Sequence, residues 1–147
     1  MLVLDHSIFA ANTVAGVNID SAGVFVQANS SVFANNTGNG LTVPAASGQA
    51  PLMATNSIFY GNGGTGITVS SALTGTFTAS HHNAFGSNAS GNSGWTNSST
   101  DVTLTANPFT TSTNFALNAA AGGGAALKGA GYPGIFPAPR PLQECSI

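Results

Sequence analysis

Phenylalanine recurs along this chain at a nearly fixed interval. The five residues concerned are separated by 24, 26, 26 and 24 positions, and they are Phe9, Phe33, Phe59, Phe85 and Phe109. A repeat of about 20 to 50 residues is typical of chains whose units bury their apolar side chains by stacking on one another. The chain of 147 residues is therefore expected to form one stack of about five similar units.

Other residue types repeat with the same period. An asparagine stands three residues after each of the first four phenylalanines, and a glycine stands seven residues after each of the first three. These residues are Asn12, Asn36, Asn62 and Asn88, with Gly16, Gly40 and Gly66. Both types tolerate left-handed backbone, so we expect them to form tight corners. Apolar residues between the corners alternate with a period of two, as in Ile67 and Val69, which predicts short strands, and the units show no stretch with the 3.6-residue period of a helix.

The corners recur at matched offsets, so equivalent strands of successive units are expected to pair in parallel at about 4.8 Å. Asparagines aligned at that spacing can hydrogen-bond from unit to unit as a ladder. The residues seven and five positions before each phenylalanine are expected to point inward. They are Leu2 and Leu4, Val26 and Ala28, Leu52 and Ala54, and Val102 and Leu104. The prediction is an all-β solenoid formed by residues 1–118, with residues 119–147 as an irregular closing tail of the same domain.

The segment Asn56-Ser57-Ile58-Phe59, followed by Asn62 and Gly66-Ile67, resembles the coils of right-handed parallel β-helix proteins of the pectate-lyase-like superfamily. The segment 106–127 is similar to the closing segment of secreted bacterial β-helix repeat proteins. The resemblance implies a right-handed parallel β-helix and favours an extracellular or cell-surface location. It implies no single activity, because lyases, hydrolases and phage tailspikes share the fold. Members are usually at least twice as long, so the chain is expected to be a fragment or a truncated member.

Charge is scarce, with two basic and four acidic residues, whereas about a quarter of an average domain is charged. Nucleic-acid binding is excluded as a function class because it depends on Lys and Arg neutralising phosphates. No apolar run reaches the roughly 20 residues of a membrane-spanning helix, so no membrane partner is expected. The single cysteine, Cys145, forms no intrachain disulfide. The opening MLVLDHSIFA lacks the basic segment that begins a signal peptide.

The titratable residues suggest only weak catalytic candidates. Asp5, Asp20 and Asp101 fall at different offsets within their units, so no metal site and no cofactor is predicted. His81 and His82 are the one local concentration of titratable groups. They and Asp101 are the candidate catalytic residues, although exposed polar corner residues are the favoured interpretation. Neighbours in a strand point to opposite faces, and Asp101 is expected to lie some distance along the sheet, which argues against a hydrolase site.

Ligand binding and self-association are predicted from the apolar and aromatic residues. The candidate binding residues are Phe25, Met53, Phe77, Tyr60 and Trp95. Aromatic rings can stack on sugars, although Trp95 is more often a core or end-cap residue. Outward positions give an apolar stripe of Phe25, Pro51, Met53 and Phe77. A homo-oligomer is expected through this stripe or through the C-terminal tail, since soluble monomers rarely expose such a patch.

Three function classes follow from these observations. The first is a structural or carbohydrate-binding β-helix module, with a glycan as its partner. The second is a polysaccharide- or ester-cleaving enzyme whose site lies at a subunit boundary or in a missing segment. The third is an assembly unit of a fibre or tailspike.

Overall fold

The computed structural model describes residues 1–21, 24–43, 52–69 and 80–132. These residues form short strands throughout and one helix of four residues near the C-terminal end. The elements are β1 (Leu2–Asp5), β2 (Ile8–Ala10), β3 (Val17–Asn18), β4 (Val26–Asn29), β5 (Val32–Ala34), β6 (Leu41–Val43), β7 (Leu52–Thr55), β8 (Ile58–Tyr60), β9 (Ile67–Val69), β10 (Ala84–Gly86), β11 (Val102–Thr103) and α1 (Gly124–Leu127). None of the helical structure in these ranges is long enough and apolar enough to cross a membrane.

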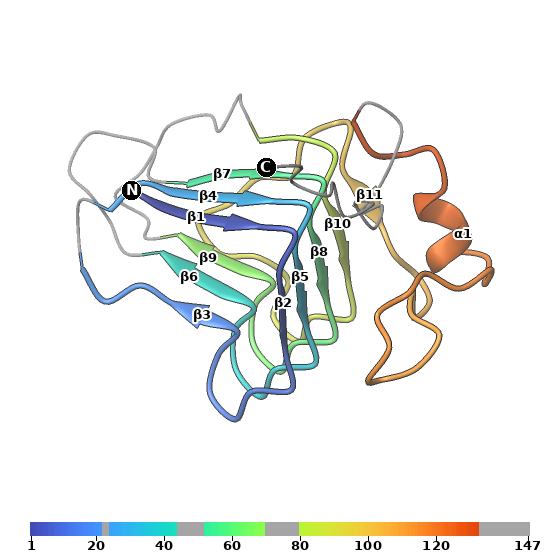
Figure 1. Cartoon of the computed structure of the whole chain (residues 1–147), viewed down its shortest axis with the longest axis horizontal. Helices are drawn as coiled ribbons and strands as arrows, with labels where there is room; N and C mark the ends of the chain where they lie inside the picture. The colour runs from blue at the N-terminus through green and yellow to red at the C-terminus, as the bar shows by residue number, and fades with distance from the viewer. Residues whose placement is uncertain (22–23, 44–51, 70–79, 133–147) are drawn as a thin grey trace, which may run out of the picture.

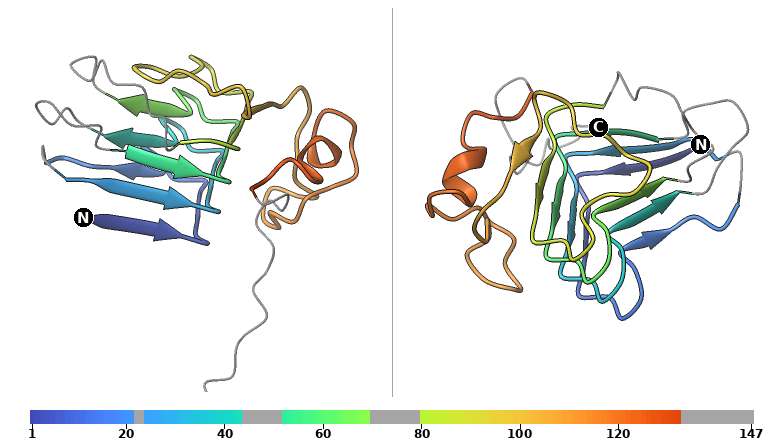
Figure 2. Two further views of the ribbon diagram at one scale, coloured as in Figure 1. Left: turned by 90° about the horizontal axis from the view of Figure 1, so that it is seen from above. Right: turned by 180° about the vertical axis from the view of Figure 1, so that it is seen from behind.

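The strands of the described residues belong to three parallel sheets, which take every third strand of the chain as far as β9, whereas β10 and β11 both join the sheet of β8. Their orders are β1-β4-β7, β2-β5-β8-β10-β11 and β3-β6-β9. The chain therefore passes through all three sheets in one turn before it begins the next rung (Figure 1). Figures 1 and 2 together show that the chain advances along the stack in a right-handed sense, the hand that parallel crossovers almost always take. The predicted right-handed parallel β-helix is confirmed.

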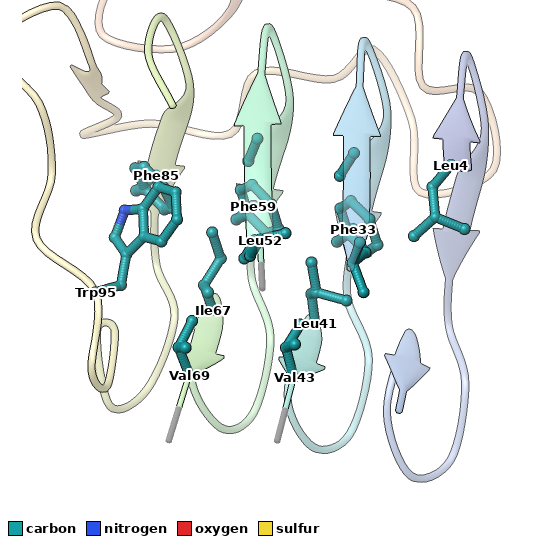
Figure 3. Packing of buried hydrophobic residues seen from close by; sticks show 13 residues of the cluster. Leu4, Phe33, Leu41, Val43, Leu52, Phe59, Ile67, Val69, Phe85 and Trp95 are labelled. Carbon is teal, nitrogen blue, oxygen red and sulfur yellow. The ribbon is translucent and has the colours of Figure 1, made fainter. Parts of the chain in front are cut away.

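The phenylalanine repeat sets the register. Phe33 pairs directly with Phe9 on one side and with Phe59 on the other, and Phe59 pairs with Phe85. The rings stack with centroids 5.1, 4.8 and 5.2 Å apart. Figure 3 shows that Trp95 follows Phe85 at the end of this column, with the ring centroids 6.4 Å apart. The phenylalanines that recur from Phe9 to Phe85 therefore form one stacked column that faces the interior.

The residues predicted to point inward do so in the first three rungs. Val26 and Ala28 of β4 are fully buried, and Leu52 and Ala54 of β7 are buried beside them. Together with side chains of the other two sheets, such as Leu41 in Figure 3, they fill the interior of the solenoid. The alternation that predicted the strands is thus an alternation between core and surface.

Eight of the twelve described residues with a positive φ lie in two columns that the repeat did not predict. Positive φ occurs at the corner between the first two strands of a rung and again directly before the ladder asparagine. The two columns are His6, Ser30, Asn56 and His82, and Ala11, Asn35, Gly61 and Ser87. None of the seven asparagines and glycines that the repeat aligns has a positive φ, so the left-handed residues stand at other positions of the corners. A Cβ added to Gly40 would lie 2.6 Å from the carbonyl oxygen of Gly66, so this glycine is required by the close approach of two rungs.

The fifth rung differs from the prediction. Phe85 pairs with Thr103, and Ala84 pairs with Val102, so β11 follows β10 after 18 residues. Val102 therefore continues the column of Ala84 instead of the predicted column of Leu52. Phe109 lies outside the stacked column, in a second cluster where it meets Tyr60 edge-on at 6.2 Å. Leu104 is buried in that second cluster together with Leu127 of α1.

Candidate functional site

A ladder of asparagine side chains runs along one corner of the solenoid. The Nδ2 of each asparagine donates to the Oδ1 of the next, at 2.9, 2.9 and 2.8 Å. The ladder consists of Asn12, Asn36, Asn62 and Asn88. Asn36 and Asn62 are 2% and 1% exposed, and a buried amide is tolerated only when it is hydrogen-bonded. The predicted ladder is confirmed.

Each ladder amide also binds the backbone, and always with the same polarity. The backbone N–H of Asn62 donates to the Oδ1 of Asn88 at 3.2 Å. The Nδ2 of Asn62 donates back to the carbonyl oxygen of Phe33 at 3.0 Å, and that of Asn88 donates to Phe59 at 2.9 Å. The bonds between side-chain amides therefore all run toward the C-terminal end of the stack, where the ladder ends at Asn88, and the second Nδ2 hydrogen of Asn36, Asn62 and Asn88 points back to the preceding rung.

A second ladder, which sequence reasoning missed, lies two residues before each of the first four phenylalanines and ends at Asp101. Here a backbone N–H of one rung donates to the side-chain oxygen of the next, at 3.2, 3.2, 3.1 and 2.7 Å. Its members are Ser7, Ser31, Ser57, Asn83 and Asp101. The recurrence of serine at the first three of these positions is a sequence signal that could have revealed it.

Asp101 is the last member of this second ladder. One of its carboxylate oxygens accepts the backbone N–H of Asn83 at 2.7 Å, and the other accepts that of Ser98 at 2.8 Å. The expectation that Asp101 lies some distance along the sheet was wrong, because the shortened fifth rung places it directly after Asn83. Asp101 therefore lies one rung beyond Asn83, the residue that follows His82. The backbone N–H of His82 donates in the same direction, to Thr100 Oγ1 at 3.2 Å.

His81 and His82 contact each other. Their Nδ1 atoms are 2.9 Å apart, one donating to the other, and the rings meet edge-on. The expectation that they point to opposite faces was wrong, because His82 leaves the strand at a corner with a φ of 58°. The neighbouring Ser80 is buried, and its hydroxyl oxygen accepts the backbone N–H of Ala54 at 3.0 Å.

Tyr132 packs on this histidine pair. Its ring lies 5.2 Å from the ring of His81 and 5.5 Å from that of His82. Its backbone N–H donates to Asn56 Oδ1 at 2.7 Å, and its carbonyl oxygen accepts a hydrogen bond from Asn56 Nδ2. One amide side chain thus holds a residue of the tail against the corner of the third rung.

Replacing Asn56 with alanine is expected to release Tyr132. The change removes two hydrogen bonds, each contributing about 0.5 to 1.5 kcal/mol, and places alanine at a φ of 53°. Amide exchange at Tyr132, measured by NMR, should accelerate at least about tenfold for a loss of about 1.4 kcal/mol. Ser30→Ala is the matched control because Ser30 occupies the same corner at a φ of 46°. Equal protection of Tyr132 in both variants would contradict the assignment.

A pocket of about 450 Å³ opens at the C-terminal end of the asparagine ladder. Its wall combines two aromatic rings with amides, hydroxyls and backbone. It is lined by Phe85, Gly86, Ser87, Asn88, Gly91, Asn92, Trp95, Thr96, Asn97 and Thr103. Asn92 is fixed there by its own contacts, since its Oδ1 accepts the backbone N–H of Ile67 at 2.9 Å and its Nδ2 donates to Asn97 at 3.0 Å. The lining contains aromatic, amide and hydroxyl groups and carries no charged side chain.

Of the predicted binding residues, Trp95 lies in this pocket. Tyr60, partly exposed, packs against Phe109 on another side of the solenoid. Met53 lies on the outer face of β7, where it pairs with Gln27 of β4. Gln27 separates Met53 from the exposed Val3 of β1, so this column of the predicted apolar stripe is interrupted. Phe25 is also partly exposed, whereas Pro51 and Phe77 lie outside the described residues.

Within the described ranges, no three His, Cys, Asp or Glu side chains come together in a way that could hold a metal ion. Comparisons with protein-family models, with curated proteins and with solved structures find no match to this chain.

Proposed function

We propose that this protein is a carbohydrate-binding β-helix module and that the sugar binds in the pocket at the end of the asparagine ladder. The composition of that pocket carries the proposal. Sugars present C–H faces that pack on aromatic rings and hydroxyls that pair with amides, and this pocket offers both in an uncharged wall. Its volume of about 450 Å³ is within the usual range of small-ligand sites.

Membership of a superfamily is part of the same proposal. The right-handed parallel winding and the asparagine ladder support a place for this chain within the pectate-lyase-like superfamily. An extracellular or cell-surface location is part of the proposal, because that is where a glycan-binding module would meet polysaccharide.

The single tryptophan makes the proposal directly testable. Trp95 is the one tryptophan of the chain and it lines the pocket, so its fluorescence reports on occupancy. Titration with a panel of neutral oligosaccharides is expected to give a saturable change in Trp95 emission with at least one of them. Asn97→Ala, which removes an amide from the wall, should weaken that binding, whereas Asn18→Ala on the distant strand β3 should leave it unchanged. An emission spectrum that no oligosaccharide alters would refute the proposal.

A second candidate, a polysaccharide- or ester-cleaving enzyme, is favoured by one observation. The two imidazoles contact each other, and the backbone N–H groups of His82 and Asn83 donate to Thr100 and Asp101, so the histidine pair lies beside the segment that carries Asp101. If this corner is catalytic, turnover of polysaccharide or ester substrates should be lost in His82→Ala. His6→Ala is the matched control because His6 occupies the equivalent corner of the first rung. Absence of turnover by the unmodified protein would remove this candidate.

A further inference from the structure

The end of the asparagine ladder has donors whose acceptors are missing. In each of the first three rungs, the backbone N–H and the Nδ2 of the ladder asparagine both donate to the Oδ1 of the next asparagine. Asn62 donates to Asn88 in this way at 3.2 and 2.8 Å. At Asn88 the equivalent acceptor is absent from the described residues, because the chain shortens its next rung. The Nδ2 of Asn88 keeps its bond to Phe59, and its second hydrogen and the backbone N–H have no partner within the described ranges.

The residue before Asn88 presents a further donor in the same direction. The backbone N–H groups of Asn35 and Gly61 each donate to a carbonyl oxygen of the following rung at 3.0 Å. Ser87 occupies the equivalent position in the fourth rung, and no described residue accepts its N–H. Ser87 and Asn88 both line the pocket. One wall of the pocket therefore carries three N–H groups: the two of Asn88 that converge on an asparagine Oδ1 elsewhere in the stack, and that of Ser87, whose equivalents donate to a backbone carbonyl oxygen.

We propose, building on the carbohydrate-binding function, that the pocket recognises an acetamido sugar through its amide carbonyl. The carbonyl oxygen occupies the position that the next asparagine Oδ1 would have had, and it accepts the backbone and side-chain N–H groups of Asn88, while the N–H of Ser87 is left to a hydroxyl oxygen of the same sugar. The acetamido methyl group and the sugar ring lie against Trp95 and Phe85, the apolar part of the lining. The lower rungs supply the precedent, because the group they bind in this geometry is the carbonyl of a carboxamide.

Charge favours this choice over an acidic sugar. Removing a carboxylate from water is costly unless a cation or several strong donors replace its hydration, and none of the residues lining the pocket is basic. A sugar hydroxyl is a weaker fit, because at each of the three junctions of the ladder the group that accepts the N–H groups is a carbonyl oxygen. The neutral amide satisfies the donors without a burial penalty for charge.

Two disaccharides that differ only at the acetamido positions test this inference on the full chain. N,N′-Diacetylchitobiose is expected to bind at least about tenfold more tightly than cellobiose by Trp95 fluorescence, and to shift the backbone and side-chain amide signals of Asn88 in ¹H–¹⁵N spectra. Equal affinity for both sugars would overturn the acetamido assignment and leave the carbohydrate proposal standing. Binding of neither sugar, nor of any other neutral oligosaccharide, would overturn both. Tighter binding of a uronate disaccharide would overturn the assignment as well.

A variant pair locates the effect at the end of the ladder. Asn88→Asp keeps an acceptor for Asn62 but replaces the Nδ2 donor with an oxygen, so the preference for diacetylchitobiose should fall at least about tenfold. Asn12→Asp makes the same replacement at the opposite end of the ladder and should leave the preference unchanged. If Asn88→Asp does not fold, the Asn88 amide shifts of the unmodified protein decide the question. A preference that survives in folded Asn88→Asp would overturn the inference.

Discussion

Replacing Phe59 with alanine is expected to lower the free energy of unfolding by about 3 to 5 kcal/mol, the usual range for a buried phenylalanine. Phe59 is fully buried, and its ring stacks on Phe33 at 4.8 Å and on Phe85 at 5.2 Å. Its removal leaves a cavity between rungs whose backbones are fixed by strand pairing on three sides. Urea unfolding followed by circular dichroism measures the loss.

Phe9→Ala provides the comparison within the same column. Phe9 is partly exposed and stacks on a single described ring, that of Phe33 at 5.1 Å. Its loss should therefore be clearly smaller than that of Phe59→Ala. Equal losses for the two variants would show that stacking within the column contributes little to stability.

Replacing Asn62 with leucine is expected to cost on the order of 4 kcal/mol, because four hydrogen bonds are lost, three of them buried, and each contributes about 1 kcal/mol. The side-chain amide of Asn62 bonds to Asn88 and to the carbonyl oxygen of Phe33. Its oxygen accepts both the backbone and the side-chain N–H of Asn36. Leucine leaves these groups buried without partners. The free energy of unfolding from urea titration again gives the result.

Asn97→Leu is the control for the ladder. Asn97 is exposed, and the hydrogen bond that its side chain makes to Asn92 is at the surface. Its replacement should change stability by less than about 1 kcal/mol, as surface substitutions usually do. A similar loss in the two variants would mean that the ladder does not stabilise the fold.

The parts of the fold that could be predicted are those in which the repeat itself sets the register. When residues 24 or 26 positions apart pair in parallel strands, a phenylalanine must lie beside a phenylalanine and an asparagine beside an asparagine. The column from Phe9 to Phe85 and the ladder from Asn12 to Asn88 follow from this spacing alone.

The fifth rung could not be predicted, because a coincidence of spacing concealed its true register. Phe109 lies 24 residues after Phe85, as the repeat requires, yet β11 pairs with β10 after 18 residues. The contact that accompanies this register is the bond from Asn83 to Asp101, which depends on a carboxylate replacing a serine or asparagine in its column. Periodicity carries no information about such a replacement.

The candidate site depended on two features that periodicity does not show. His81 and His82 meet because one of them lies at a left-handed corner, and strand alternation says nothing about corners. The pocket exists because the shortened rung leaves the end of the ladder uncovered beside Trp95. Trp95 could be selected as an aromatic candidate, whereas Ser87 and Asn88 look like any other corner of the repeat.

The ladders and strand pairs described above join each coil to its immediate neighbours, and this has a consequence for how the molecule comes apart. The free energy of unfolding of such a stack is approximately the sum of a contribution from each coil and a contribution from each junction between adjacent coils. Repeat stacks generally need at least about three units to persist. The strands β1 to β9 make three coils, and β10 belongs to the next. Breaking the middle junction would leave two pairs of coils, each below that minimum. The described coils should therefore unfold together in a single cooperative transition.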